Sequence, residues 1–417
     1  MKRKLYTVLL LVAVGALGAQ ENWLGRWDGE MLLSDGAVAF SVLVARDGAL
    51  LDIPTQELYG YPSAGIEMAP AELKLGWQFG GGQLVMQLGA GTQAQGAAFT
   101  GRFAQGGIAG SLSFSRSPRQ PDSARAYDVR MPDGALLPGE LVLPLVGGSR
   151  APIVILHAGL GAADRDGNNY NVPGTSDSLK QLAEALAIRG IASYRYDKRG
   201  AGLASWLVPA EKDLSFEAWI RDLGALASHF SKDRRFSGVW LLGMNDGAVI
   251  AMAAANAGAP AKGAIVACSS AESMLDSYEK AIKSAPAEMQ AEGTRILDAL
   301  LRGTIYPAPS PFFEASFRPS FQPYLMEAFR HDIKDELRRY GGPVLLIQGD
   351  MDMQATLADF MALGEASPSA TPYIVPYMNH VFKDVSPDVE ENYAAFSDPS
   401  FPLSQAFADT IATFVFR

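Results

Sequence analysis

From residue 127 onward, short apolar runs alternate with segments of helical periodicity, and this alternation constrains the fold more than any other feature. Runs such as 153–156 and 344–347 are apolar throughout, which is typical of strands buried on both faces. Segments such as 178–189 and 216–230 carry apolar residues at helical spacing. Strands that alternate with helices predict a mostly parallel sheet with helices on both faces.

One insertion interrupts this alternation. Residues 272–339 predict a helical, aromatic-rich segment between two core strands, with Pro307, Pro309 and Pro311 in its middle. Because open α/β sheets bind ligands at the carboxyl ends of their strands, such an insertion is typical of a lid that shapes a substrate pocket. A peripheral helical layer is the alternative interpretation.

The first 126 residues have three parts. Residues 1–19 combine a basic start, a short apolar run and small residues at the end, which predicts a secretory signal peptide and export to the periplasm or the extracellular space. An uncleaved membrane anchor is the alternative, and no other stretch is long enough to span a bilayer. Residues 20–116 hold short alternating runs between glycine turns, at 27–34, 37–45, 84–88, 98–103 and 108–114. They predict a small antiparallel β domain, and residues 117–126 predict a linker to the domain 127–417.

Composition removes several classes of function. The net charge is −10 and the pI is about 5.0, so no basic surface for nucleic acid is expected. Cys268 is the only cysteine, which excludes an internal disulfide and a thiolate metal cluster. With four histidines in 417 residues, a histidine-rich metal site is not expected either.

The most informative motif lies between a strand-like run, 239–242, and an alanine-rich helix, 248–257. Gly243 and Gly247 enclose three residues in the pattern of the nucleophile elbow, G-x-S-x-G. The glycines permit a tight turn, and the middle residue sits strained at its tip, where its side chain meets substrate. In this chain the tip residue is Asn245 and not serine.

Two further residues complete a catalytic constellation. Asp352, with Asp350 as a neighbour, follows the buried strand 344–347, and His380 lies in a loop after the next strand. The order of nucleophile, acid and histidine is that of α/β-hydrolases. In that arrangement His380 is the general base, and Asp352 holds its tautomer.

A glycine-containing loop follows the first long buried strand. Here Gly159 and its neighbours would let backbone N–H groups converge on an oxyanion, and the two predicted donors are the amides of Leu160 (or Gly159) and Asp246. Asp164 and Arg165 come next. They predict either a charged group that gates or braces the site, or a solvated loop with an internal ion pair.

At these residues the chain resembles the bacterial α/β-hydrolase esterases that carry an extra N-terminal β domain, a group related to the S9 and S33 serine-peptidase-like hydrolases. The likeness covers nearly everything after the signal peptide. It is carried by segments 159–166, 197–202, 243–247, 317–324, 349–354 and 379–380. The resemblance implies an α/β-hydrolase fold, carboxylesterase activity on short acyl esters, no cofactor, and a small-molecule ester or acyl ligand.

The departure from this family is Asn245, because an amide nitrogen is a poor nucleophile that histidine cannot usefully deprotonate. Three hypotheses follow. The protein is a weak hydrolase in which His380 activates water directly, or it is a non-catalytic binder that uses Asn245 as a hydrogen-bonding group. In the third, a neighbouring group replaces the nucleophile, either Asp246 or an aspartate formed by deamidation of Asn245.

Overall fold

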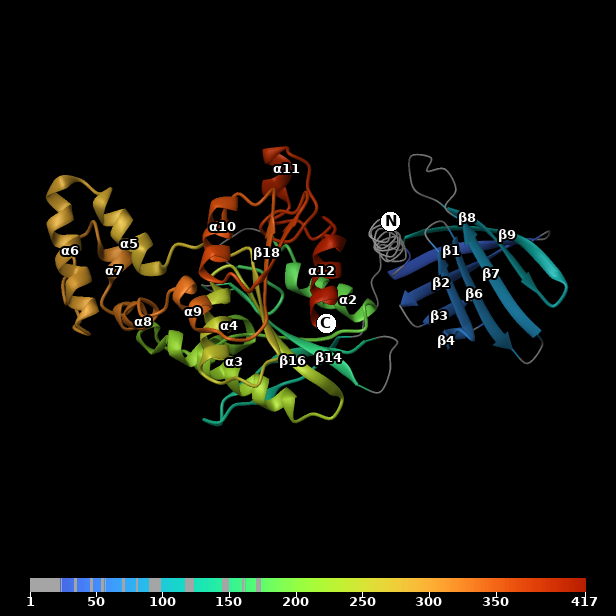
Figure 1. Ribbon diagram of the computed structural model, residues 1–417, viewed down its shortest axis with the longest axis horizontal. Coiled ribbons are helices and arrows are strands. Elements are labelled where there is room, and N and C mark those ends of the chain that lie inside the picture. Colours follow the sequence, from blue (N-terminus) through green and yellow to red (C-terminus); the bar gives the residue numbers. More distant parts are fainter. Residues whose placement is uncertain are drawn as a thin grey trace, which may run out of the picture. The chain divides into compact units, whose positions relative to one another are not determined.

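The structure is a computed structural model that describes residues 23, 25–33, 36–45, 48–53, 56, 58–69, 72–79, 82–89, 99–116, 124–144, 150–159, 161, 163–169 and 174–417. These residues form an N-terminal β domain and an α/β domain (Figure 1). The predicted signal peptide lies outside the described residues, as does most of the predicted linker. Within the described ranges, no helix has the length and apolarity needed to cross a membrane.

The N-terminal domain is one antiparallel sheet of nine strands, in the order β4-β3-β2-β1-β9-β8-β7-β6-β5. Its strands are β1 (Gly25–Leu33), β2 (Gly36–Ala45), β3 (Gly48–Ile53), β4 (Leu58–Pro62), β5 (Gly65–Ala69), β6 (Glu72–Phe79), β7 (Gly82–Gly89), β8 (Phe99–Gln105) and β9 (Ile108–Arg116). The predicted antiparallel domain is confirmed. The sequence reading missed β3 to β6, although Leu73, Leu75 and Trp77 of β6 alternate with polar residues and are buried.

The α/β domain contains an eight-stranded sheet in the order β10-β13-β15-β14-β16-β17-β18-β19. Its strands are β10 (Ala124–Ala126), β13 (Gly139–Val142), β14 (Ala151–His157), β15 (Ala192–Tyr196), β16 (Phe236–Met244), β17 (Gly263–Ala267), β18 (Val344–Gly349) and β19 (Thr371–Val375). Strands β14 to β19 are parallel, and β10 and β13 add antiparallel pairs at one edge. A separate small ladder joins β11 (Val129–Arg130) and β12 (Leu136–Leu137). Residues 124–126 of the predicted linker therefore belong to the sheet.

Helices cover both faces of this sheet, as the strand and helix alternation predicts (Figure 1). They are α2 (Ser178–Ile188), α3 (Phe216–Ser231), α4 (Gly247–Asn256), α10 (Leu357–Ala366), α11 (Val389–Ala394) and α12 (Gln405–Val415), with short 3-10 turns at Gly202–Leu207 and Glu211–Asp213. Helix α3 begins where the Ser215 side chain accepts the Ala218 N–H, and α10 begins with a capping box between Thr356 and Asp359. The parallel sheet, its order and its helices are those of the α/β-hydrolase fold.

The predicted insertion lies between β17 and β18. It consists of α5 (Met274–Lys283), α6 (Ala287–Leu301), α7 (Glu314–Phe317), α8 (Gln322–Ala328) and α9 (Ile333–Arg339). Helix α8 packs on α3 and α9 packs on α4. Buried aromatic residues of the insertion, such as Phe317 and Tyr324, join the main core cluster, which anchors these helices to the α/β domain.

Candidate active site

The loop between β16 and α4 is a strained, tight turn. Asn245 lies at its tip with φ of +51°, in the left-handed region that L residues other than asparagine and aspartate rarely adopt. A Cβ atom on Gly243 would lie 2.3 Å from the carbonyl oxygen of Gly247, and one on Gly247 would lie 2.7 Å from that of Ala158. Only glycine fits at these two positions, so the elbow depends on both.

The backbone of Asn245 is held from both sides. Its N–H donates to the carbonyl of Ala267 at 2.9 Å, at the end of the neighbouring strand β17. Its own carbonyl accepts the N–H of Ala248 at 2.9 Å, in the first turn of α4. Among the described residues no hydrogen bond partner is found for the Asn245 side chain, which is half-buried. The tip amide is therefore presented without a protein partner in this part of the chain.

Asp352 and His380 are in direct contact. The Nδ1 atom of His380 lies 2.9 Å and 3.1 Å from the two carboxylate oxygens of Asp352. Both side chains are almost completely buried, and the imidazole stacks on Phe396 with an interplanar angle of 9°. Because a carboxylate accepts and does not donate, Nδ1 carries the hydrogen and Nε2 is left as the basic nitrogen.

The Asp352 carboxylate has further donors that hold its orientation. The Gln348 Nε2 atom donates to it at 2.9 Å, and the backbone N–H groups of Gln354 and Ala355 donate at 2.8 and 3.0 Å. Cys268 also lies close to this carboxylate. Burial and the charge of Asp352 raise the pKa of the Cys268 thiol well above its usual range, so the thiol stays neutral.

The histidine loop is also braced. The Asn379 side chain is fully buried and accepts the N–H groups of Val381 and Lys383, at 3.1 and 3.0 Å. Asn392 of α11 contacts Asn379 and donates to the carbonyl of Met351 at 2.7 Å, which ties the histidine loop to the acid loop. These supports keep the His380 and Asp352 pair in one geometry, as an acid and base pair requires.

Of the residues predicted to form the oxyanion hole, Gly159 and Asp246 are described by the structure. The Asp246 N–H, at the start of α4, has no hydrogen bond partner among the described residues, and helix N-termini favour negative charge. An ideal Cβ on Gly159 would lie 3.7 Å from the Cβ of Asn245, so the glycine loop meets the elbow. Leu160, the other predicted donor, lies outside the described residues.

The sequence reading missed Lys198, which lies beside the site just after β15. Its side chain is 2% exposed, and its Nζ donates to the carbonyl of Gly159. The same Nζ lies 5.0 Å from the centroid of the Trp219 ring. Burial lowers the pKa of Lys198 to about 7, although Asp246 and Asp164 act in the opposite direction. The sequence offered one signal. Lys198 lies two residues after a buried strand and two before Gly200, which places it near the carboxyl end of that strand, where open α/β sheets bind ligands.

The charged loop after Gly159 braces the end of β15. Arg165 donates to the buried Asp197 carboxylate at 2.6 and 3.1 Å, and its backbone N–H donates to the same side chain. Asp164 accepts the N–H groups of Asp166 and Asn168 at 2.9 Å, which closes its own loop. The observed role of Arg165 is therefore to connect two loops, and Asp164 shapes one of them.

The other three histidines have structural partners. His157 is buried beside the Tyr196 hydroxyl at 2.7 Å, and burial lowers its pKa well below the usual value. His331 contacts Glu217 and Glu336, and His229 contacts a tyrosine. Of the four, only His380 follows a strand of the parallel sheet together with an acidic partner.

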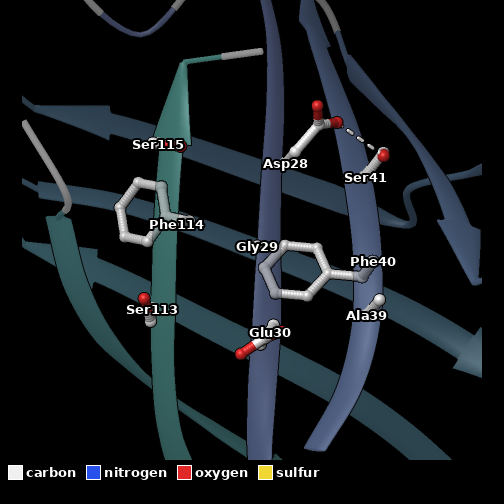
Figure 2. A pocket seen from close by; sticks show the side chains of 9 residues that line it. All are labelled: Asp28, Gly29, Glu30, Ala39, Phe40, Ser41, Ser113, Phe114 and Ser115. Atoms are coloured by element: carbon white, nitrogen blue, oxygen red, sulfur yellow. Dashed lines mark hydrogen bonds between the residues drawn. The ribbon is translucent and has the colours of Figure 1, made fainter.

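A hollow lies in the N-terminal domain, on strands β1, β2 and β9 (Figure 2). Phe40 and Phe114 flank Gly29, where an added Cβ would lie 2.7 Å from the Cβ of Phe114. Asp28 accepts the Ser41 hydroxyl at 2.7 Å. The residues that line this hollow include no histidine, lysine or arginine. We therefore place the candidate active site in the α/β domain.

Comparisons with known proteins agree with this placement. A family model described as serine aminopeptidase, S33, matches residues 173–301. The matched segment contains the elbow and ends before Asp352 and His380. A search of curated proteins found no match.

Several solved structures are similar in fold. Est1E from Butyrivibrio proteoclasticus is 15% identical with a TM-score of 0.46, and the match covers 71% of this chain and 100% of that one. The esterase domain of a Rhodothermus marinus protein is 15% identical with a TM-score of 0.40, covering 70% and 99%. The α/β hydrolase GrgF from Penicillium sp. sh18 is 17% identical with a TM-score of 0.43, covering 62% and 91%.

The stability of the fold is expected to depend on Lys198 above neutral pH. The folded lysine releases its proton near pH 7, whereas the unfolded chain keeps it up to the ordinary pKa of 10.5. Between these values the unfolded state binds more protons, so this residue makes the free energy of unfolding rise with pH. Urea denaturation near pH 7 and near pH 10 should show the natural protein gaining stability relative to Lys198→Met. An unchanged difference between the two proteins would contradict this assignment.

Proposed function

We propose that this protein is a hydrolase of the carboxylic-ester type whose activity is weak or altered because asparagine replaces the nucleophilic serine. One observation carries the proposal: the His380 and Asp352 pair is assembled and buried, and the imidazole interacts electrostatically with Asp246, the residue after the strained tip of the elbow. Strained backbone persists at functional sites when the surrounding structure holds it in place. The family model gives support for a hydrolase class, because its match includes the elbow.

The substitution changes the mechanism and not only the rate. Serine attacks a carbonyl because histidine takes its proton, but the lone pair of the Asn245 amide nitrogen is delocalised into its own carbonyl. Asp246 is a poor replacement, since its φ of −62° and ψ of −20° are helical and the strained position is residue 245. Burial also raises the pKa of the Asp246 carboxyl, which disfavours its charged form.

In the proposed reaction water is the nucleophile. The Nε2 atom of His380 takes a proton from water as the water oxygen bonds to the ester carbonyl carbon. The resulting oxyanion accepts the Asp246 N–H, and Asp352 stabilises the imidazolium. The intermediate then expels the alcohol, which takes the proton back from His380 and leaves a carboxylic acid. Asn245 donates to or accepts from the substrate as a hydrogen-bonding group.

A second candidate function is a non-catalytic binder of a small acyl or ester ligand. It is favoured by the Asn245 amide, for which the described residues supply no hydrogen bond partner and which can bind a ligand through both its oxygen and its nitrogen. On either reading the partner is a small molecule and not nucleic acid, and the N-terminal segment directs the protein to the periplasm or outside the cell.

The natural protein and its His380→Ala variant, assayed on short-chain p-nitrophenyl esters, distinguish these functions. Slow hydrolysis that disappears in the variant, without covalent labelling by a fluorophosphonate, supports water activation by His380. Labelling would instead identify a hidden nucleophile, and the mass of the elbow peptide would show whether Asn245 had become aspartate. Equal background rates, together with saturable binding of an ester or acyl ligand, would identify the binder and contradict the hydrolase.

A further inference from the structure

Where the insertion returns to the sheet, a histidine lies between two carboxylates. His331 is in the link between α8 and α9. Its Nδ1 atom lies 3.0 Å from the Oε1 atom of Glu336, in α9, and its Nε2 atom lies 3.1 Å from the Oε1 atom of Glu217, in the first turn of α3. One imidazole ring therefore connects the insertion to a helix that covers the sheet.

Both contacts require a hydrogen on the ring. An ionised carboxylate accepts hydrogen bonds and cannot donate them, so each ring nitrogen has to supply the hydrogen of its own contact. A neutral imidazole carries one such hydrogen, and the imidazolium carries two. The geometry around His331 thus fits the charged ring, and one of the two hydrogen bonds is lost when the ring loses a proton.

Glu336 is held by several elements at once. Its side chain is almost completely buried, and a buried carboxylate needs charged or hydrogen-bonded partners. Besides His331, it contacts Arg339 of its own helix. It also accepts the side-chain amide of Asn256, the last residue of α4, at 2.7 Å. The carboxylate of Glu336 and the ring of His331 therefore bring α3, α4 and α9 together.

The remaining neighbours of the ring do not compete for its two hydrogens. Phe216 of α3 stacks on the imidazole, with ring centroids 5.3 Å apart. Helix α8 contributes Glu327, whose carboxylate accepts the Ser215 hydroxyl at 2.7 Å and the N–H of Glu217 at 3.1 Å. Within the described part of the chain, the carboxylates in contact with the ring are those of Glu217 and Glu336.

The charges act on the ring in the direction that this geometry requires. Burial lowers the pKa of His331, but the hydrogen bonds and charges of Glu336 and Glu217 raise it more, so the pKa lies above its ordinary value of 6.5. A histidine with a raised pKa in the folded state stabilises that state below its unfolded pKa. This contribution is lost as the pH rises through the raised value.

We propose that His331, Glu217 and Glu336 form a pH-sensitive clamp: the charged ring fixes the returning end of the insertion, α8 and α9, to α3 and α4, and loss of its proton loosens that end. Ile333 and Leu337 of α9 share an apolar cluster with Ala248, in the first turn of α4. The clamp is therefore linked to the helix that begins at the elbow. This inference does not depend on the proposed hydrolase function.

The protonation of His331 can be measured directly, because the chain has only four histidines. In protein with isotope-labelled histidine, the NMR signals of His331 are those that disappear in His331→Gln. Both ring nitrogens should be protonated at about pH 5.5, with a titration midpoint above 6.5. Glu217→Gln removes one carboxylate and should lower this midpoint. A midpoint at or below 6.5, or one that Glu217→Gln leaves unchanged, would overturn the proposal.

Amide hydrogen exchange tests whether the clamp holds the insertion. In the natural protein, exchange in residues 322–339, corrected for the intrinsic effect of pH, should be faster at about pH 9 than at about pH 5.5. The expected difference is about 10-fold or more, since a hydrogen bond to a charged group stabilises by at least this factor. His331→Gln should exchange rapidly at both pH values, because its side chain stays neutral.

His229→Gln is the matched control. It makes the same change near the other end of α3, where the ring contacts the Tyr127 hydroxyl at 3.1 Å and not a carboxylate. This variant should keep the pH dependence of the natural protein in residues 322–339. Equal corrected exchange at both pH values in the natural protein, or the same pH dependence in His331→Gln, would show that His331 is not a clamp.

Discussion

Replacing Asn245 with serine is expected to raise the hydrolysis of short p-nitrophenyl esters by at least about 10³-fold, because loss of the serine from a complete triad costs about 10⁶-fold in turnover. The remaining parts are already in place, since His380 and Asp352 are in contact and the elbow turn is formed. Serine is smaller than asparagine and fits the same tip. The measurement is kcat/KM for the variant and the natural protein at neutral pH.

Asn245→Ala is the control for this gain, since it removes the amide without adding a hydroxyl. It should be no faster than the natural protein, and only the serine variant should react with a fluorophosphonate. An inactive but folded Asn245→Ser protein would show that His380 does not reach the tip or that the oxyanion donors are not poised. The hydrolase account would then have to be abandoned.

Asp352→Asn, introduced into the Asn245→Ser protein, is expected to lower kcat by about 10⁴-fold, the loss seen when a triad aspartate becomes asparagine. Asparagine keeps the shape but can donate from its amide, so the imidazole loses the acceptor that fixes Nδ1–H. Gln348 and the two backbone donors would meet an amide instead of a carboxylate. The measurement is kcat at several pH values, with thermal unfolding to verify the fold.

Asp350→Asn is the matched control, because it makes the same chemical change two residues away. The Asp350 carboxylate accepts the N–H of Tyr377 at 2.6 Å, and an asparagine oxygen can accept the same bond. This variant should keep kcat within a few-fold of its parent. Equal losses at both positions would mean that the acid loop is only structural, and that Asp352 does not act on His380.

Much of the site could be predicted because its motifs are local. The pattern from Gly243 to Gly247 predicts a tight turn because a side chain at either glycine would collide with nearby backbone, and the structure places the strained φ at Asn245. Asp352 follows the buried strand β18, and His380 follows β19, the largely exposed strand at the edge of the sheet. Parallel strands end at the same edge of a sheet, so residues 28 positions apart could be expected to meet there.

Other parts were beyond the reach of pattern reading. The antiparallel pairing of β10 and β13 depends on which edge the short strands join, and strands of three and four residues carry too little periodicity to decide it. The supports of the histidine loop, such as Asn379 and Asn392, come from residues that look like ordinary polar loop positions. Asn379 and Asn392 are buried because segments distant in the sequence pack around them, and only in that packing do their side chains support the loop.

By itself, the sequence determined the alternation of strands and helices, the strained elbow and the absence of a nucleophilic hydroxyl at its tip, because these depend on residue type and on neighbours along the chain. Only the tertiary structure decided that Lys198 binds the Gly159 carbonyl, 39 positions away, and that Asp352 is held by Gln348. A hydrogen bond is directional and acts over about 3 Å, so which groups form it is settled only when the strands have been placed side by side.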